Sequence, residues 1–565
     1  MDFKEEIVKM LDSNIEELSY EEIDKLLEVP KESKLGDYAM PCFSLSKIFR
    51  KAPNIIAEEL KEKLEVPSFL DKIESISGYL NFFINRKEFS KSIIDSILNN
   101  DDYGSSNLGD GKNVILDYAS LNVAKPFHIG HLKNAVTGNS LYRIYKKLGY
   151  NPIAINHLGD FGTQFGKLIY AYKTWGDDEK IKENGIYELT DLYQKFHVEA
   201  EKDPSLEDKG REWSLKIEEK DPEAIRIWTY FKDISIEYFN RLADKMDLKF
   251  DKIIGEAFYM DFVDDTVKKI KEKNLLVESE GAQVVMLDEY NMPPCIILRS
   301  DGGSLYATRD ITGAIYRAEN FNFVKSIYIT GSEQILHFKQ WFKVIEKMGY
   351  PWANGLVHLG HGMVKLESGK LSTRGGNIIT LEEAINEAKE KALEIMIQNG
   401  RDGIENREQV AEDIGIGAMT FINLYNSANK DVTFSWETAL RFDGETGPYL
   451  QYTHARCNSL IKKAGQVDYS KVNPELYQDQ TTFEVIKALN NYQNVIVSAG
   501  EKFEPSYICR YLIDLAQKFN KFYNEYSIVV DDEEVKATRI ALVSAVKKVL
   551  KDGLHLVCIK APDEM

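Results

Sequence analysis

Two histidines three positions apart carry the clearest chemical signal in the sequence. His128-Ile129-Gly130-His131 opens a segment in which apolar residues recur at spacings of three and four. A helix with this period would begin at the histidines, so its unpaired N–H groups and both imidazoles would face one space. That space suits an anion, because helix N-termini carry partial positive charge and imidazoles donate hydrogen bonds to phosphate oxygens. A metal site and ordinary helix capping are the alternative interpretations of these four residues.

The elements that must position the histidines form a βαβ pattern. An apolar run at 114–116 indicates a buried strand, the helical period ends at Gly149, and a second apolar run occupies 152–155. A unit of this kind points the helix N-terminus at whatever binds beyond the sheet. Gly159, Gly162 and Gly166 lack the spacing of a dinucleotide fingerprint, so no NAD site is expected.

The surrounding segment resembles a known family. SLNVAKPFHIGHLKNAVTGNSLYRIYKKLGY, followed by INHLGDFGTQFG, is similar to the signature region of class I aminoacyl-tRNA synthetases, with its HIGH motif, and specifically to arginyl-tRNA synthetases. Four further segments of that family follow in order: DGGSLYATRDITGA (301–314), GSEQILHFKQ (331–340), KLSTRGGN (370–377) and ETGPYLQYTHAR (445–456). The resemblance extends to both ends of the chain. It implies ATP-dependent attachment of L-arginine to arginine tRNA through an arginyl-adenylate, with release of AMP and pyrophosphate.

An arginine pocket needs carboxylates in planar geometry for the guanidinium and acceptors for the α-amino group. Tyr306 and Asp310 lie one helical turn apart and so can face one pocket. The resemblance implies that these two residues hold the guanidinium. It adds Asp117 as a helper at the guanidinium, Asn122 and Gln334 at the backbone end of the amino acid, Ser120 as a lesser candidate, and Glu256 and Tyr259 as residues bordering the pocket.

For ATP, the resemblance implies phosphate contacts from His128, Gly130 and His131 and from a second loop containing Lys370, Ser372, Thr373 and Arg374. That loop reads Lys-Leu-Ser-Thr-Arg where the class has Lys-Met-Ser-Lys-Ser, so the second lysine is missing. We expect Lys125 to supply the missing cation, assisted by Lys370 and Arg374. Positioning the loop or meeting tRNA phosphate is the alternative role for Lys125. Mg²⁺ is expected to neutralise phosphate charge, and no protein-bound metal is expected.

A chain of 565 residues is too long for one core and predicts about three domains. We expect an α+β domain at 1–105, a Rossmann-like, doubly wound parallel-sheet catalytic domain at 106–380 with a helical insertion at about 175–255, and an α-helical bundle at 381–565. Apolar runs at 284–286, 296–298, 327–329 and 357–359 are predicted strands of the parallel sheet. The resemblance makes the first domain a tRNA-contacting module and the last an anticodon-binding domain, with candidate tRNA contacts Tyr449, Tyr452, Arg456 and Met565.

Composition bears on nucleic-acid binding, on metal and disulfide sites, and on membrane association. A net charge of −19 opposes nucleic-acid binding by the surface as a whole, so positive charge at a tRNA site must be local. The five cysteines are scattered singly, which disfavours zinc and disulfide frameworks. No apolar run approaches the roughly 20 residues of a membrane span, and the first residues are not a signal peptide. We expect a cytoplasmic monomer without membrane partners.

Two other classes of protein agree less well with the sequence. A relative that only binds RNA would be expected to lose the histidines or the Tyr306 and Asp310 pair, and the sequence keeps both. A small-molecule nucleotidyltransferase of the same fold would lack the long helical region after 381.

Overall fold

The computed structural model describes residues 3–30, 32, 35–366, 369–370, 379–398, 400–401 and 403–565. Two compact units form. Unit 1 comprises Met1–Tyr103, Arg456–Tyr492 and Asp514–Val549, and unit 2 comprises Gly104–Ala455, Gln493–Ile513 and Leu550–Met565. No helix among the described residues is long and apolar enough to cross a membrane.

Unit 1 combines a small sheet with helices. The antiparallel sheet has the order β1 (Tyr38–Pro41), β3 (Tyr79–Ile84), β2 (Leu70–Ile76). Around it the first hundred residues form α1 (Phe3–Asp12), α2 (Tyr20–Leu26), α3 (Ser46–Phe49), α4 (Pro53–Lys63) and α5 (Arg86–Asn99). Helix α20 (Gln480–Asn490) packs on α5 through Phe89 and Phe483, whose rings lie 5.4 Å apart. This contact joins two parts of unit 1 that are far apart in the sequence.

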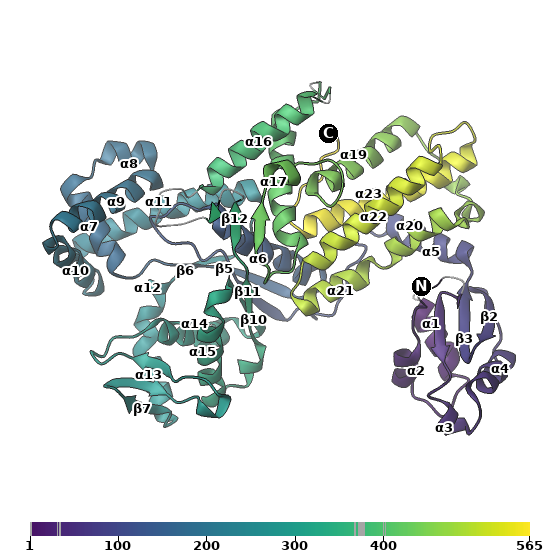
Figure 1. Ribbon diagram of the computed structural model, residues 1–565, viewed down its shortest axis with the longest axis horizontal. Helices are drawn as coiled ribbons and strands as arrows, with labels where there is room; N and C mark the ends of the chain where they lie inside the picture. The colour runs from purple at the N-terminus through teal and green to yellow at the C-terminus, as the bar shows by residue number, and fades with distance from the viewer. Residues whose placement is uncertain are drawn as a thin grey trace. The chain divides into compact units, whose positions relative to one another are not determined.

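Unit 2 is organised by a parallel sheet with the order β11 (Leu356–His361), β10 (Phe323–Gly331), β4 (Asn113–Asp117), β5 (Asn151–Leu158), β6 (Lys252–Gly255). Helix α6 (Ile129–Lys147) connects β4 to β5, as the βαβ pattern predicts. Helices α14 (Tyr306–Phe321) and α15 (Ile335–Lys347) lie beside one another next to β10 and β11 (Figure 1). The predicted parallel-sheet fold is confirmed.

Two of the four predicted strands do not join this sheet, so that prediction is wrong. Residues 284–285 and 296–298 belong to β8 (Ala282–Val285) and β9 (Cys295–Leu298), which form a separate antiparallel sheet with β7 (Leu276–Ser279). For β8 the reason is the turn that joins it to β7, where Glu280 and Gly281 have φ values of 51° and 79°. A two-residue turn with positive φ closes a hairpin, whose strands must be antiparallel.

Between β5 and β6 the chain forms α7 (Thr163–Trp175), α8 (Asp178–Asn184), α9 (Ile186–Lys202), α10 (Ser205–Glu218) and α11 (Pro222–Met246). Helices α7 to α10 gather in one cluster (Figure 1). Helix α11 begins with Pro222 after the N-cap Asp221, whose side chain accepts two backbone N–H bonds. It returns to the loop after β4, where Ser235 Oγ accepts the Ala124 N–H at 2.9 Å.

The rest of unit 2 up to residue 370 contains α12 (Glu256–Tyr259), α13 (Val263–Glu272), β12 (Val364–Leu366) and β13 (Gly369–Lys370). From residue 381 the described chain is mainly helical, which confirms the predicted helical region. Its helices are α16 (Leu381–Gln398), α17 (Arg407–Tyr425), α18 (Trp436–Ala439), α19 (Gly447–Ala464), α21 (Tyr492–Lys502), α22 (Ser506–Glu525) and α23 (Glu533–Leu556), besides α20. One short strand, β14 (Val432–Phe434), pairs with β12.

Candidate functional site

A cavity of about 640 Å³ lies at the carboxyl ends of β4 and β10 in unit 2. Ligands of open parallel sheets bind in this position. One wall comes from the loop after β4 and the start of α6 and includes Asp117, Ala119, Ser120, Gly130 and His131. The facing residues come from α14 and from the chain after β10 and include Tyr306, Asp310, Arg317, Gln334 and His337. The cavity thus joins the two groups of residues to which the sequence analysis gave separate ligands.

The two histidines begin α6, and their ring nitrogens have distinct roles. His128 Nδ1 accepts the Gly130 N–H at 3.1 Å, and His131 Nδ1 accepts the His128 N–H at 3.3 Å. Backbone N–H groups can only donate, so both Nδ1 atoms are unprotonated and a neutral ring carries its proton on Nε2. Both histidines therefore cap the helix, but only through Nδ1, so each ring keeps an Nε2–H donor.

Burial keeps both imidazoles neutral. It lowers the pKa of His128 to about 4, with a smaller contribution from the charge of Lys125. Burial also holds the pKa of His131 well below its usual value, and the neighbouring His128 adds to the effect. The two rings stack with centroids 3.6 Å apart, which would oppose two positive charges. Near neutral pH the pair can donate to an anion without being cationic.

The second predicted phosphate loop falls largely outside the described residues. This applies to Ser372, Thr373 and Arg374 and to the side chain of Lys370. The described chain on its far side lies against the histidine loop, because Ile129 N donates to Ile379 O at 3.2 Å and Leu381 N donates to Phe127 O at 2.7 Å. Backbone hydrogen bonds therefore tie the end of this loop to the start of α6.

Helix α14 carries the arginine-binding candidates on one face. Asp310 Oδ2 accepts a 2.6 Å hydrogen bond from His337 Nε2. Arg309 pairs with Glu256 at 2.7 Å, and its guanidinium lies 5.1 Å from the centroid of the Tyr306 ring. Tyr306 is 66% exposed at the start of the helix. The carboxylates of Asp310 and Glu256 therefore already have partners from the protein.

Asp117 ends β4 and forms a buried ion pair. Its Oδ2 lies 2.7 Å from Arg317, with side chains 7% and 2% exposed. Arg317 Nε also donates to the Tyr259 hydroxyl at 3.4 Å. The second oxygen, Asp117 Oδ1, is buried without a hydrogen-bond partner among the described residues. A buried acceptor in this state is costly unless a ligand supplies a donor.

Among the residues predicted for the ATP and arginine sites whose side chains the structure describes, four are not among those that line the cavity: His128, Asn122, Lys125 and Tyr259. Asn122 forms a β-bridge with Gly159, at which an added Cβ would lie 2.2 Å from Asn122 Oδ1. Lys125 lies with its Nζ 5.9 Å from the ring centroid of Tyr193 on α9, and burial lowers its pKa. Ser120 and Gln334 do line the cavity.

The predicted tRNA contacts lie mainly on α19. Tyr449 and Tyr452 are half-buried in unit 2. In unit 1, Arg456 donates to Asn520, and its guanidinium lies 4.9 Å from the Tyr523 ring centroid. Met565 is buried in unit 2, with 7% of its surface exposed. A contact from Met565 to a base would need this side chain to become accessible.

Sequence reasoning missed Arg309, Arg317 and His337. The available signal was helical spacing, since Tyr306, Asp310, Gly313 and Arg317 recur at intervals of four, three and four and all line the cavity. No comparable signal identified His337, because its partner Asp310 lies on another helix.

Three family models match this chain. The model described as tRNA synthetases class I (R), catalytic domain, matches residues 93–436, the DALR anticodon binding domain matches 450–565, and the arginyl tRNA synthetase N terminal domain matches 2–84. The chain is 49% identical over its whole length to the arginine–tRNA ligase of Alkaliphilus metalliredigens, and 50% identical to that of Clostridium botulinum strain Alaska E43, with full coverage of each relative.

Solved structures give the same fold. An arginyl-tRNA synthetase structure from Thermus thermophilus aligns with a TM-score of 0.80 at 23% identity, covering 95% of this chain and 96% of the other. One from Plasmodium falciparum aligns with a TM-score of 0.79 at 23% identity, covering 99% and 98%. From the full-length identities and the three matched models, the chain belongs to the arginyl-tRNA synthetase family, the arginine–tRNA ligases of class I.

Proposed function

We propose that the cavity of unit 2 is where this arginine–tRNA ligase forms arginyl-adenylate from L-arginine and ATP. The observation that supports this assignment is that one cavity is lined both by Gly130 and His131 and by Tyr306 and Asp310. Anion donors and guanidinium acceptors are therefore close enough to hold two substrates that must react with each other. No protein nucleophile is needed, because the arginine carboxylate itself attacks the α-phosphorus of ATP.

On the arginine side, Asp310 and Tyr306 receive the guanidinium at the start of α14. Asp117 Oδ1 accepts a donor from the same substrate, which relieves its unpaired state. Gln334 and Ser120 contact the backbone end, and Asn122 acts from behind the loop. A neutral side chain of similar shape would leave these acceptors unpaired, which is the main source of selectivity.

On the phosphate side, the Nε2–H groups of His128 and His131 and the Gly130 N–H donate to ATP oxygens. Donors fixed before the reaction stabilise charge that develops on the phosphates without further rearrangement. Lys125 supplies the cation that the second loop lacks, and Lys370, Ser372, Thr373 and Arg374 complete the site when ATP is bound. The charge of Lys125 contributes, after burial, to the lowered pKa of His128 and His131.

Mg²⁺ enters with the ATP phosphates in this proposal. Among the described residues, no group of three or more His, Cys, Asp or Glu side chains is placed to hold a metal ion. The ion would therefore be held mainly by phosphate oxygens, as is usual for Mg²⁺ with nucleotides.

Transfer to tRNA follows in the same cavity, where the 2′-hydroxyl of the terminal ribose attacks the activated carbonyl. Tyr449, Tyr452, Arg456 and Met565 are proposed contacts for the anticodon region, and residues 1–105 for another part of the tRNA. We also propose that the active species is a monomer. The boundaries at 105 and 380 and a cytoplasmic location remain predictions.

The test is arginine-dependent ATP–pyrophosphate exchange, with and without arginine tRNA. L-Citrulline, which replaces the guanidinium by a neutral ureido group, and L-lysine serve as comparison substrates. Of these three amino acids, we expect only arginine to support exchange. Exchange with citrulline at comparable kcat/KM would overturn the carboxylate assignment. Wild-type exchange by a folded Lys125→Ala variant would remove Lys125 from the mechanism while leaving the rest of the proposal standing.

A further inference from the structure

The segment 556–562 follows α23 and is built into unit 2. Cys558 is buried and has a left-handed backbone, with φ of 60°. Gln451 Nε2 donates to Lys560 O at 2.9 Å, and Lys560 Nζ pairs with Asp413 at 3.0 Å. His454 Nδ1 lies 3.0 Å from Pro562 O. The segment is thus held on one side by α17 and α19.

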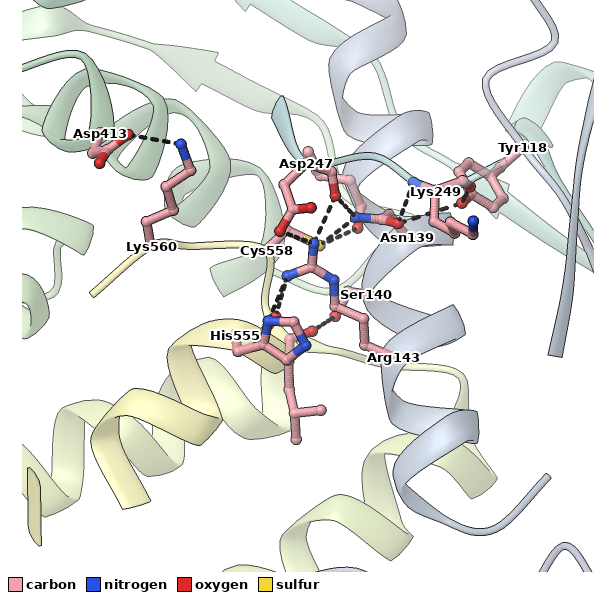
Figure 2. A network of polar contacts seen from close by, with 12 residues as sticks. Tyr118, Asn139, Ser140, Arg143, Asp247, Lys249, Asp413, His555, Cys558 and Lys560 are labelled. Atoms are coloured by element: carbon pink, nitrogen blue, oxygen red, sulfur yellow. Dashed lines mark hydrogen bonds and ion pairs between the residues drawn. The ribbon is translucent and has the colours of Figure 1, made fainter. Parts of the chain in front are cut away.

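On its other side, the segment and the preceding residue His555 accept hydrogen bonds from three side chains of α6. Ser140 Oγ donates to Leu556 O at 2.7 Å, Asn139 Nδ2 donates to Cys558 Sγ at 3.2 Å, and Arg143 donates to His555 O at 2.6 Å. Figure 2 shows these side chains projecting from α6 toward His555 and Cys558. Two of these acceptors are carbonyls in the last turn of α23, and His555 O also accepts the Cys558 N–H at 3.0 Å.

Asn139 also contacts the opposite side of the network. Its Nδ2 donates to Asp247 O at 2.8 Å, and its Oδ1 accepts the Lys249 N–H at 3.0 Å. These two partners fix the orientation of the amide, because one can only accept and the other can only donate. The side chain is fully buried, so removing it would leave several groups unpaired.

Tyr118 connects this network to the cavity. Its hydroxyl donates to Lys249 O and lies 3.4 Å from Asn139 Oδ1 (Figure 2). Its ring lies against α6 so closely that a Cβ at Gly138 would come within 2.2 Å of Tyr118 Cγ. The residues on either side of Tyr118, Asp117 and Ala119, both line the cavity.

The loop beyond Tyr118 needs external support. Ala119 and Ser120 have φ values of 70° and 47°, which non-glycine residues rarely adopt and which cost free energy unless neighbours hold them. Helix α6 supplies part of this support, because Asn134 Oδ1 accepts the Ala119 N–H at 2.7 Å. Asn139 supplies another part through Lys249 and Tyr118.

We propose that Asn139 is a positioning residue for arginine activation, through which the segment 556–558 holds Asp117 and the loop Tyr118–Ser120 in their binding geometry. The Asn139 side chain lies between the segment and the loop, and it hydrogen-bonds to both Cys558 and Lys249. The inference rests on the proposed role of Asp117. A change at Cys558 should therefore alter the affinity for arginine, although Cys558 does not line the cavity.

The test combines two readouts on the full-length protein. Hydrogen exchange of peptides covering 118–124 reports whether the loop is held, and ATP–pyrophosphate exchange with tRNA gives KM for arginine and kcat. The variants are Asn139→Ala, Cys558→Ala and the pair. Asn423→Ala is the matched control, since Asn423 is buried in α17 and its Nδ2 donates to Met419 O of the same helix at 2.8 Å.

We expect Asn139→Ala to speed exchange at 118–124 and to raise KM for arginine by about tenfold, the scale of one lost buried hydrogen bond, with a smaller change in kcat. Cys558→Ala should raise KM by about threefold, and the double variant should be no worse than Asn139→Ala. Asn423→Ala should lower the melting temperature but leave both readouts unchanged.

If hydrogen exchange at 118–124 is unchanged in Asn139→Ala, Asn139 does not hold the loop and the proposal is overturned. Faster hydrogen exchange with an unchanged KM for arginine would overturn the proposed effect on arginine activation. Equal changes in KM for Asn139→Ala and Asn423→Ala would overturn it as well. Should Asn139→Ala fail to fold, Cys558→Ala decides alone, because it leaves the bonds of Asn139 to Asp247 and Lys249 intact. Asp117→Asn is measured in parallel, so that a wild-type KM there identifies a failure of the proposed function rather than of the link.

Discussion

The cavity has a phosphate wall, at the start of α6, and an arginine wall, at the start of α14, and their polar side chains differ in whether they already have partners. On the phosphate wall, His128 and His131 are neutral, and backbone N–H groups fix their rings so that Nε2–H donors remain. Around the proposed arginine site, Asp310 and Glu256, together with Asp117 at the end of β4, are each already paired with a cationic or donating side chain of the protein. Donors on the first wall can act as they stand. Acceptors on the second wall must share or exchange their partners when a guanidinium arrives.

A substitution on the arginine wall should have the largest effect on activity. Replacing Asp310 by Asn keeps the shape but removes the charge that pairs with the guanidinium, so we expect kcat/KM for arginine to fall about 10³-fold, or about 4 kcal/mol. ATP–pyrophosphate exchange measures this. Asp264→Asn on α13 is an exposed control and should behave as wild type. A fall of less than tenfold would mean that Asp310 does not carry the recognition.

The phosphate wall should affect the rate rather than arginine binding. His128→Gln removes one of the fixed donors, and we expect kcat for activation to fall about 10²-fold with KM for arginine nearly unchanged. Single-turnover formation of the adenylate would separate this step from tRNA transfer. A rise in KM for arginine without loss of kcat would erase the distinction between the two walls.

His337 tests whether the existing partners on the arginine wall matter. We expect His337→Asn to raise KM for arginine about five- to tenfold, because the 2.6 Å bond that orients Asp310 is lost, while kcat stays close to wild type. Lys339→Ala on the same helix is the exposed control. A lower KM in His337→Asn would instead show that His337 competes with the substrate for Asp310.

The smallest effect concerns pH. The folded-state pKa of His128 is about 4, below the unfolded value of about 6.5, so unfolding takes up a proton between these values and stability falls as the pH drops through this window. Removing the group in His128→Gln should flatten the slope of the unfolding free energy by up to about 1.4 kcal/mol per pH unit. Denaturant unfolding at pH 4.5 to 7 measures it. An unchanged slope would show that His128 is not neutral in the folded protein.

The sequence predicted the phosphate wall better than the arginine wall for a physical reason. Residues 114–149 form a local unit in which apolar period, a terminating Gly149 and the histidine spacing all agree, and the β4–α6–β5 arrangement followed. Pairs such as Asp117 with Arg317 join residues 200 positions apart, which no local pattern specifies. The separate sheet of β7, β8 and β9 was not predicted, because the apolar runs at 284–286 and 296–298 do not reveal whether their strands pair in parallel. Asn122 was assigned by resemblance and not by geometry, and it does not line the cavity.

The bond between Asn139 and Cys558 spans 419 positions of the chain. At about 5–20 residues per second, roughly 20–80 s of translation separate the two partners. During that interval the nascent chain carries the histidines, the carboxylates and the strained loop but not the segment that holds the loop in place. A nascent chain that still lacks residues 556–558 should therefore bind arginine poorly. The late arrival of this segment would make arginine affinity one of the last properties that the new enzyme acquires.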